Sequence, residues 1–319
     1  MLSNKLNISG LFSSLALLFL IAFYSACETE FIPENINSEP ELVVEGYIEL
    51  GEDALPPYVI LTRSRPFFNT IDSNQLNNIF VRGAEVIVSN NGQSVRLTEF
   101  CLNDLPLLVR KQVADQLGLD PDSLSTNICA YIDIQAQIIL KEGQSYSLSV
   151  KAGTNSVNAI TTIPVHIPLD SLWWKEAPGK PSDTLLQLMT RVNDPAGIKN
   201  FYRYFCSING GEFNTPFNSV NDDALIDGKK FEFRLIKPNE RGEDFDQSTF
   251  GLFKIGDSVA IKWSAIDESH FNFWNTLEFN KGNQGPFSTY TTINSNIKGG
   301  LGNWGGYHSK IYRLKVKRE

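Results

Sequence analysis

Alternation of hydrophobic and polar residues dominates the chain beyond residue 41 and predicts β-strands with one buried face. The clearest case is 84–88, followed by Asn91-Gly92 and the stretch 95–98, which together predict a tight hairpin. The predicted strands are 42–48, 58–62, 84–88, 95–98, 130–140, 146–150, 157–162, 185–192, 201–208, 231–236, 258–264 and 309–316. Many short strands separated by polar turns indicate a mainly β, antiparallel, sandwich-like fold.

Two segments show helical spacing instead. Asp104 is positioned to cap a helix that begins near Pro106 and continues to residue 117. In the second segment, Phe271, Trp274 and Leu277 form an apolar stripe that ends near 282. Either Asp267 or Ser269 is expected to cap this second helix.

The proline-containing stretch 164–168 divides the chain into two predicted domains. We expect an N-terminal β-sandwich at 41–165, Ig-like or transthyretin-like, with a helical insertion at 101–129. A C-terminal β-rich domain follows at 166–319, with one helix near its end. A length of 319 residues accommodates about two domains of ordinary size.

The first 26 residues are different in character, with a single basic residue, Lys5, before an apolar run at 11–24. This run is shorter than the roughly 20 apolar residues of a spanning helix, so a removable lipoprotein signal is favoured over a transmembrane anchor. Cys27 then becomes the lipidated N-terminus, although Tyr24 departs from the aliphatic residue usual at that position. The polar stretch 27–40 is predicted to be a tether to the membrane.

Acidic residues directly after the lipidated cysteine, Glu28 and Glu30, resemble the surface-export signal of Bacteroidota lipoproteins. We therefore expect the protein in the outer membrane, lipid-anchored and facing the extracellular side. The chain has 28 Lys and Arg against 36 Asp and Glu, a formal charge of −8. Nucleic acid is not an expected partner, because binding phosphates requires a basic surface.

Export makes a disulfide available to Cys101 and Cys129, which flank the helical insertion, and we favour it over two buried free thiols. Cys206 lies among aromatic residues and is expected to be a buried structural thiol. The histidines at 166, 270 and 308 lack metal-ligand spacing. We predict no catalytic residues, no metal and no cofactor.

Several short motifs in a fixed order resemble a group of Bacteroidota outer-membrane lipoproteins, domain-of-unknown-function family 4249. They are the run Ser295–Gly306, the preceding Gly285-Pro286-Phe287, the turn Asp194–Gly197, and the segments Ile255–Val259, Leu42–Gly46 and Arg82–Val86. The resemblance implies a β-rich surface protein often encoded beside TonB-dependent receptors. The family has no established catalytic residues that could be assigned to positions of this chain.

Two groups of residues are candidates for a ligand or interface site. Trp173 and Trp174 adjoin the predicted domain boundary, where they either bind a sugar or peptide or pack between domains, and packing is favoured. The second group lies in the glycine-rich run and consists of Asn296, Gly299, Gly300 and Trp304. This run lacks the Gly-Lys-Ser/Thr ending of a phosphate loop, so we favour a structural plug over a ligand loop.

The expected function is that of a non-catalytic surface lipoprotein that assists a TonB-dependent receptor by ligand capture or docking. Two alternatives stay open. One is a structural or adhesive envelope protein that binds another protein through a strand edge. The other is an unrecognised hydrolase whose carboxylates converge only in the fold.

Overall fold

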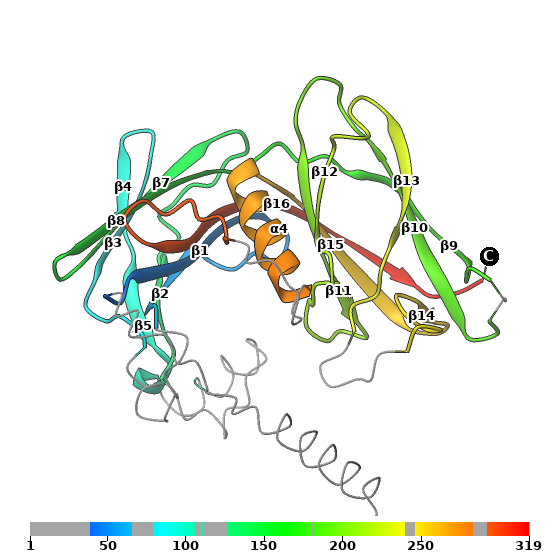
Figure 1. Cartoon of the computed structure of the whole chain (residues 1–319), viewed down its shortest axis with the longest axis horizontal. Helices are drawn as coiled ribbons and strands as arrows, with labels where there is room; N and C mark the ends of the chain where they lie inside the picture. The colour runs from blue at the N-terminus through cyan, green and yellow to red at the C-terminus, as the bar shows by residue number, and fades with distance from the viewer. Residues whose placement is uncertain are drawn as a thin grey trace, which may run out of the picture. The chain divides into compact units, whose positions relative to one another are not determined.

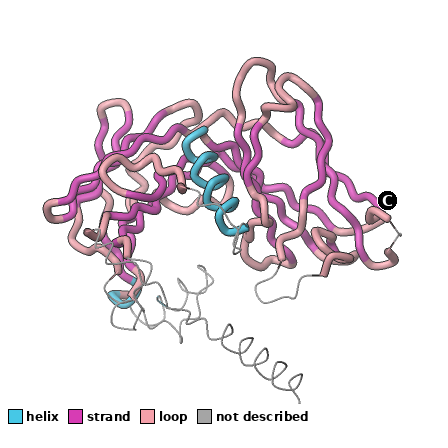
Figure 2. The backbone as a smooth tube through the Cα atoms, viewed as in Figure 1, coloured by secondary structure: helices cyan, strands magenta, loops and turns pink. Residues whose placement is uncertain are grey.

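The described part of the chain folds into β-strands with one long helix (Figures 1 and 2). The structure is a computed structural model that describes residues 39–65, 79–105, 110, 127–179, 182–239, 246–282 and 292–318. Nearly all of these belong to one compact unit, Pro40–Glu319. The predicted signal, Cys27, most of the tether and the predicted helix 106–117 apart from Arg110 lie outside the described residues.

The strands and helices are given in their order along the chain. They are β1 (Leu42–Gly51), β2 (Tyr58–Arg63), β3 (Glu85–Asn90), β4 (Gln93–Arg96), β5 (Thr98–Cys101), a 3-10 turn (Leu102–Asp104), β6 (Cys129–Ile132), β7 (Ser145–Ala152), β8 (Asn155–Thr162), β9 (Leu169–Glu176), β10 (Leu185–Asn193), β11 (Phe201–Ile208), β12 (Val220–Asp222), β13 (Lys230–Leu235), β14 (Phe253–Lys254), β15 (Ser258–Ile266), α4 (Glu268–Gly282) and β16 (Leu301–Lys315).

One large sheet connects strands from the two ends of the chain. Its order is β12-β11-β15-β16-β1-β2-β6-β5, and β16 lies at its centre (Figure 1). The strand β16 pairs with β1 in parallel and with β15 in antiparallel fashion. Two four-stranded sheets complete the fold, one with the order β4-β3-β7-β8 and the other built around β10. The mainly β, sandwich-like fold expected from the alternation is confirmed, with a parallel pair at its centre.

Two hydrophobic cores lie against the same face of the large sheet. The first packs Val44, Ile48 and Trp304 against the β4-β3-β7-β8 sheet. The second packs Trp263 and Tyr202 against the sheet built around β10. Side chains alternate between faces along a strand, so the intervening residues of β1, β11, β15 and β16 point to the opposite face. That opposite face is contacted by α4.

The hairpin predicted around Asn91-Gly92 is confirmed. Strands β3 and β4 pair in antiparallel fashion across these two residues. Both adopt positive φ values, 47° for Asn91 and 82° for Gly92, as a type I′ turn requires.

The strand predicted at 130–140 is wrong beyond Ile132, where β6 ends. The reason is Asp133, whose buried carboxylate accepts hydrogen bonds from the backbone N–H groups of Gln137 and Ile138 at 3.1 and 2.8 Å. These bonds fold the chain into a turn that includes Ala136, with φ of 51°. Alternating residue types alone do not distinguish such a turn from a strand.

The last strand is longer than predicted, because it starts at Leu301 rather than at 309. Glycine is depleted in strands, so the glycines at the start of β16 hid its first half from the prediction based on sequence. Here the glycines admit close neighbours: a β-carbon at Gly302 would lie 1.9 Å from the backbone oxygen of Val44. A β-carbon at Gly305 would lie 2.5 Å from the His270 ring of α4. Small residues therefore let β16 lie between β1 and the helix.

Asp267 caps α4, one of the two residues expected to do so. Its Oδ1 accepts a hydrogen bond from the backbone N–H of His270 at 2.8 Å, as an N-cap residue does for the third residue of a helix. Its Oδ2 accepts hydrogen bonds from the hydroxyl of Thr161 and the N–H of Thr162. One carboxylate thus starts the helix and ties it to β8.

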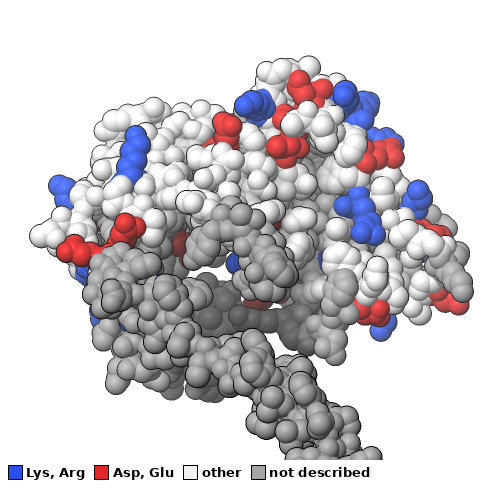
Figure 3. All heavy atoms as spheres, in the orientation of Figure 1, with Lys and Arg blue, Asp and Glu red and all other residues white. Residues whose placement is uncertain are grey.

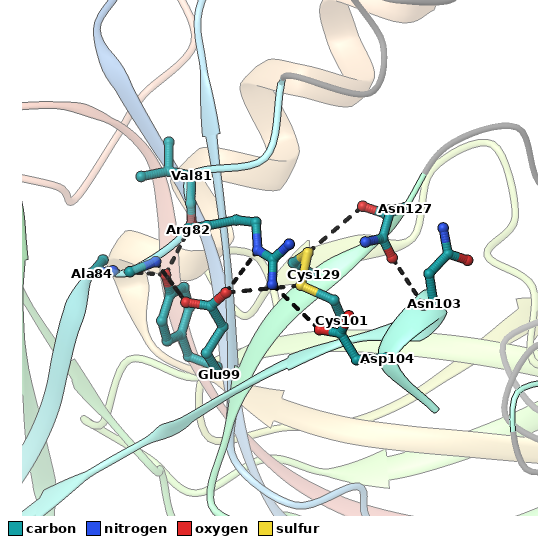
Figure 4. A network of polar contacts seen from close by, with 11 residues as sticks. Val81, Arg82, Ala84, Glu99, Cys101, Asn103, Asp104, Asn127 and Cys129 are labelled. Atoms are coloured by element: carbon teal, nitrogen blue, oxygen red, sulfur yellow. Dashed lines mark hydrogen bonds and ion pairs between the residues drawn. A yellow bond between two sulfur atoms is a disulfide. The ribbon is translucent and has the colours of Figure 1, made fainter. Parts of the chain in front are cut away.

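The disulfide between Cys101 and Cys129 is confirmed, and it joins the paired strands β5 and β6 (Figure 4). Beside it, the carboxylate of Glu99 accepts hydrogen bonds from Arg82, from the N–H of Gly83 and from the Tyr131 hydroxyl. Burial alone would raise the pKa of Glu99, but these hydrogen bonds outweigh it and lower the pKa. The network joins the end of the disulfide-linked pair to the start of β3.

Candidate functional site

A pocket of about 350 Å³ opens on the α4 side of the large sheet. We call it the central pocket. Its lining comes from five strands, two loops and the helix: Glu45, Tyr47, Glu49, Leu55, Tyr58, Arg203, Phe205, Phe213, Lys262, Trp274 and Tyr307. Four of these residues carry charge, and most of the others are aromatic. A concave site with few polar groups among aromatic walls is the usual form of a ligand pocket.

Strand register explains why these side chains meet. Glu45, Tyr47 and Glu49 occupy alternate positions of β1 and therefore share one face. Tyr58 of β2 lies opposite Tyr47, and Tyr307 of β16 lies opposite Glu49. The same face continues across the sheet through residues of β15 and β11, so residues up to 262 positions apart in sequence line one hollow.

Arg203 is the most buried cation of the central pocket, with a side chain 5% exposed. Its Nε donates to Ser219 Oγ at 3.0 Å and its Nη1 to the Tyr307 hydroxyl at 2.7 Å. Its Nη2 lies 3.9 Å from a carboxylate oxygen of Glu278 in α4. The guanidinium carbon lies 3.5 Å from the centre of the Trp274 ring, a cation–π contact. Arg203 therefore holds α4 to the sheet.

A second cation is neutralised within the pocket. Lys262 Nζ lies 2.6 and 2.7 Å from the two carboxylate oxygens of Glu49. Both side chains are largely buried, at 17% and 12% exposed. Because each charge is removed from much of its water, each depends on the other, and removal of either is strongly destabilising.

Glu45 is the carboxylate without such a partner. No hydrogen bond or ion pair joins its side chain to another residue in the described part of the chain. Its side chain reaches the solvent within the hollow, but neighbouring protein groups displace part of its water. This desolvation raises the pKa of Glu45, although the charge of Arg203 acts to lower it.

The same surroundings raise the pKa values of the tyrosines in the pocket. Desolvation raises the pKa of Tyr47, Tyr58 and Tyr307, and the negative charge of Glu45 raises each of them further. Their rings are packed together, with the centre of the Tyr47 ring 5.7 Å from those of Tyr58 and Tyr307. These hydroxyls stay protonated at neutral pH and act as hydrogen-bonding groups and aromatic walls.

The arrangement is suited to binding. Two cations are held by protein groups, one carboxylate faces the hollow, and aromatic rings surround it. Glu49 is ion-paired while Glu45 is free, so the two carboxylates of β1 do not share a proton as a like-charged pair would.

Trp173 and Trp174, predicted as a possible ligand or interface site, lie outside the central pocket on β9. They point to opposite faces of the strand. The indole N–H of Trp174 donates to the backbone oxygen of Lys315 at 2.8 Å, and its ring packs on Phe253 of the second core. Trp173 lies beneath the guanidinium of Arg191 at 5.7 Å. The structure does not bring the two rings to one surface.

The predicted residues of the glycine-rich run lie at the first core. Trp304 is fully buried, and its indole N–H donates to the backbone oxygen of Tyr146 at 3.0 Å. The side chain of Asn296 accepts from the N–H of Trp304 at 2.9 Å and donates to its carbonyl at 2.7 Å. β-carbons at Gly299 and Gly300 would lie 2.9 and 2.5 Å from backbone oxygens of neighbouring strands. The central pocket includes none of them.

Two other clusters of polar residues are visible in the described ranges. Asp194, Asp223 and Asp227 bring their carboxylate oxygens within 4.8 Å of one another. Their oxygens accept hydrogen bonds from backbone N–H groups and from Tyr202, as turns of this kind do. The rings of His166 and His308 are 5.2 Å apart; Nδ1 of His166 lies 3.1 Å from the backbone oxygen of His308, and Nδ1 of His308 lies 3.2 Å from that of Pro164. We assign no ligand to either cluster.

The residues of the central pocket were not found from the sequence. Glu45 and Glu49 alternate with apolar residues on β1, a pattern that is equally typical of a solvent-facing side of a strand. Their cationic neighbours Arg203 and Lys262 come from strands more than 150 residues later. The one signal in the sequence that could have indicated the pocket was the presence of charged residues in the middle of otherwise apolar strands.

Among the residues that the structure describes, no helix has the length and hydrophobicity that a membrane span requires. On the face shown in Figure 3, the described Lys and Arg side chains are interspersed with Asp and Glu and form no continuous basic surface. Comparison with curated proteins gave no match. The model of the family described as "Domain of unknown function (DUF4249)" matches residues 28–313. Because this match covers most of the sequence, the chain belongs to the DUF4249 family.

Proposed function

We propose that this protein is a lipid-anchored, non-catalytic binding protein of the outer-membrane surface that captures a small ligand for a TonB-dependent receptor. The observation that carries the proposal is the central pocket, a hollow of about 350 Å³ lined by charged and aromatic side chains. The signal ending before Cys27, the acidic tether and the resemblance described above support the location and the receptor.

The charge pairs of the pocket support capture rather than catalysis. Arg203 and Glu49 are each engaged by protein groups, so they preserve the shape of the hollow. A site whose polar groups are fixed before the ligand arrives binds at a lower entropic cost.

The test is affinity purification of the acylated protein from its native outer membrane, followed by identification of the proteins and small molecules that accompany it. Leu55, 55% exposed at the rim of the pocket, is replaced by Trp to obstruct the entrance. The matched control is Ile160→Trp on β8, where the side chain is 59% exposed and outside the pocket. We expect a TonB-dependent receptor with all variants, and loss of the small molecule with Leu55→Trp alone. Absence of any such receptor would refute the receptor role.

A second candidate function, attachment to another protein, is favoured by apolar side chains near the edge strand β12. Phe217 and Leu225, on either side of this strand, are 64% and 87% exposed. Edge strands with exposed apolar neighbours are common docking surfaces. If Phe217→Asp and Leu225→Asp abolish association with the partner while Leu55→Trp does not, docking rather than ligand capture is the main function.

A further inference from the structure

The cations and anions of the central pocket are unequally satisfied. Three groups engage the guanidinium of Arg203 by hydrogen bonding or charge, and Trp274 covers one of its faces. Lys262 is held by both oxygens of Glu49. An anionic ligand that displaced Glu49 or Glu278 from these cations would leave a largely buried carboxylate unpaired.

Glu45, in contrast, is available to pair with a ligand. It is the charged lining residue whose side chain has no hydrogen bond or ion pair with the described residues, and its carboxylate is accessible from the hollow. A carboxylate partly shielded by protein interacts more strongly with a positive charge than one in open water, because less solvent screens the pair. A cationic group placed here would compensate the desolvation that Glu45 already experiences.

Aromatic rings form the walls around this carboxylate. Tyr47 and Tyr58 lie opposite one another on β1 and β2, beside the strand position of Glu45. Phe205 and Trp274 line the far side, where they already stack with Arg203. The faces of aromatic rings attract cations, and the combination of rings with one carboxylate is typical of sites for ammonium and guanidinium groups.

We propose that the central pocket binds an organic cation, a ligand with a primary ammonium or guanidinium group, with Glu45 as its counter-ion and Tyr47 and Tyr58 as aromatic walls. The inference rests on the proposed function, since it names the ligand class for the same pocket. The volume of about 350 Å³ suits a group the size of an amino-acid side chain with a few additional atoms.

The experiment uses four probes of matched size: butylguanidinium, butylammonium, butyrate and 1-butanol. Their affinities for the full-length acylated protein in detergent are measured by isothermal titration calorimetry. We expect both cations to bind and the anion and the alcohol to bind at least tenfold more weakly. Glu45→Gln is expected to weaken cation binding about 10- to 100-fold, the usual effect of losing a hydrogen bond to a charged group.

Controls separate binding from folding. Glu41→Gln removes an exposed carboxylate four residues earlier that does not line the pocket, and it should leave the affinity unchanged. Glu45→Asp keeps the charge and should retain part of the affinity, while Tyr58→Leu should weaken it about two- to fivefold. Thermal unfolding verifies that each variant is folded.

The inference is overturned if butyrate or butanol binds as tightly as the cations, or if Glu45→Gln binds the cations as tightly as the unchanged protein. Small probes of this kind usually have millimolar dissociation constants. The inference is also overturned if neither cation shows binding at about 50 mM, roughly 50-fold above 1 mM. None of these results touches the receptor role, which the purification from the outer membrane decides separately.

Discussion

Replacement of Trp304 by Ala tests whether the glycine-rich run is a structural plug. The Trp304 side chain is 0% exposed within the first core, so its removal leaves a large cavity between the two sheets. Deletion of a buried Trp costs about 3–5 kcal/mol, and the indole hydrogen bond to Tyr146 adds about 1 kcal/mol. Native proteins are typically stable by about 5–15 kcal/mol, so a loss of this size is a large fraction of such a total.

The assay is denaturation by guanidinium chloride, followed by circular dichroism, together with a thermal scan. With about 2–4 °C for each kcal/mol, we expect the melting temperature to fall by roughly 10 °C or more. Trp304→Phe, which keeps an aromatic ring but loses the N–H donor, should lose less than half as much. Trp173→Ala is the matched control, because that ring is partly exposed on β9.

A different result would contradict this reasoning. If Trp304→Ala leaves the melting temperature unchanged but abolishes binding of the ligand recovered from the outer membrane, the run is a ligand loop. The buried position of Trp304 in the first core would then not reflect its contribution to stability.

Three further predictions concern cysteines and a buried histidine. Cys101→Ser together with Cys129→Ser opens a loop of 28 residues and should lower the free energy of unfolding by about 3–4 kcal/mol, measured by urea denaturation. Burial raises the pKa of the Cys206 thiol to about 12, so a thiol reagent at pH 8 should modify it only after unfolding; rapid modification of the folded protein would contradict its burial. Desolvation lowers the pKa of His270 to about 3, below the 6.5 of an unfolded His, so the unfolded state takes up more protons and stability should fall as the pH drops from about 6.5 towards 3. His270→Gln should flatten the dependence of the denaturation midpoint on pH in this window, and an unchanged slope would exclude His270 as its cause.

Features governed by neighbouring residues were predicted correctly from the sequence. Asn91 and Gly92 specify the β3–β4 turn by their tolerance of positive φ. Asp267 specifies the start of α4 through a carboxylate within reach of the third helical N–H. The disulfide between Cys101 and Cys129 followed from the position of two cysteines around one insertion. In each case the determining contact lies within about 30 residues.

Features that depend on distant partners could not be predicted in this way. The first half of β16 was concealed because its glycines are selected by the close approach of Val44 and His270, not by strand propensity. Glu45 on β1 is indistinguishable from a solvent-facing residue until the fold places Arg203 near it in one pocket. The central pocket is therefore a property of the tertiary fold, and local sequence patterns carry little information about it.

The parallel pairing of β1 with β16 has a consequence for how the protein reaches its folded state. The first core includes Trp304, so strands synthesised early cannot complete it until the final strand is available. Contacts of such large sequence separation form slowly, because a long loop must close before they contribute. The first core therefore stays incomplete until β16 pairs with β1. The same topology makes the C-terminal strand the last element to secure the fold.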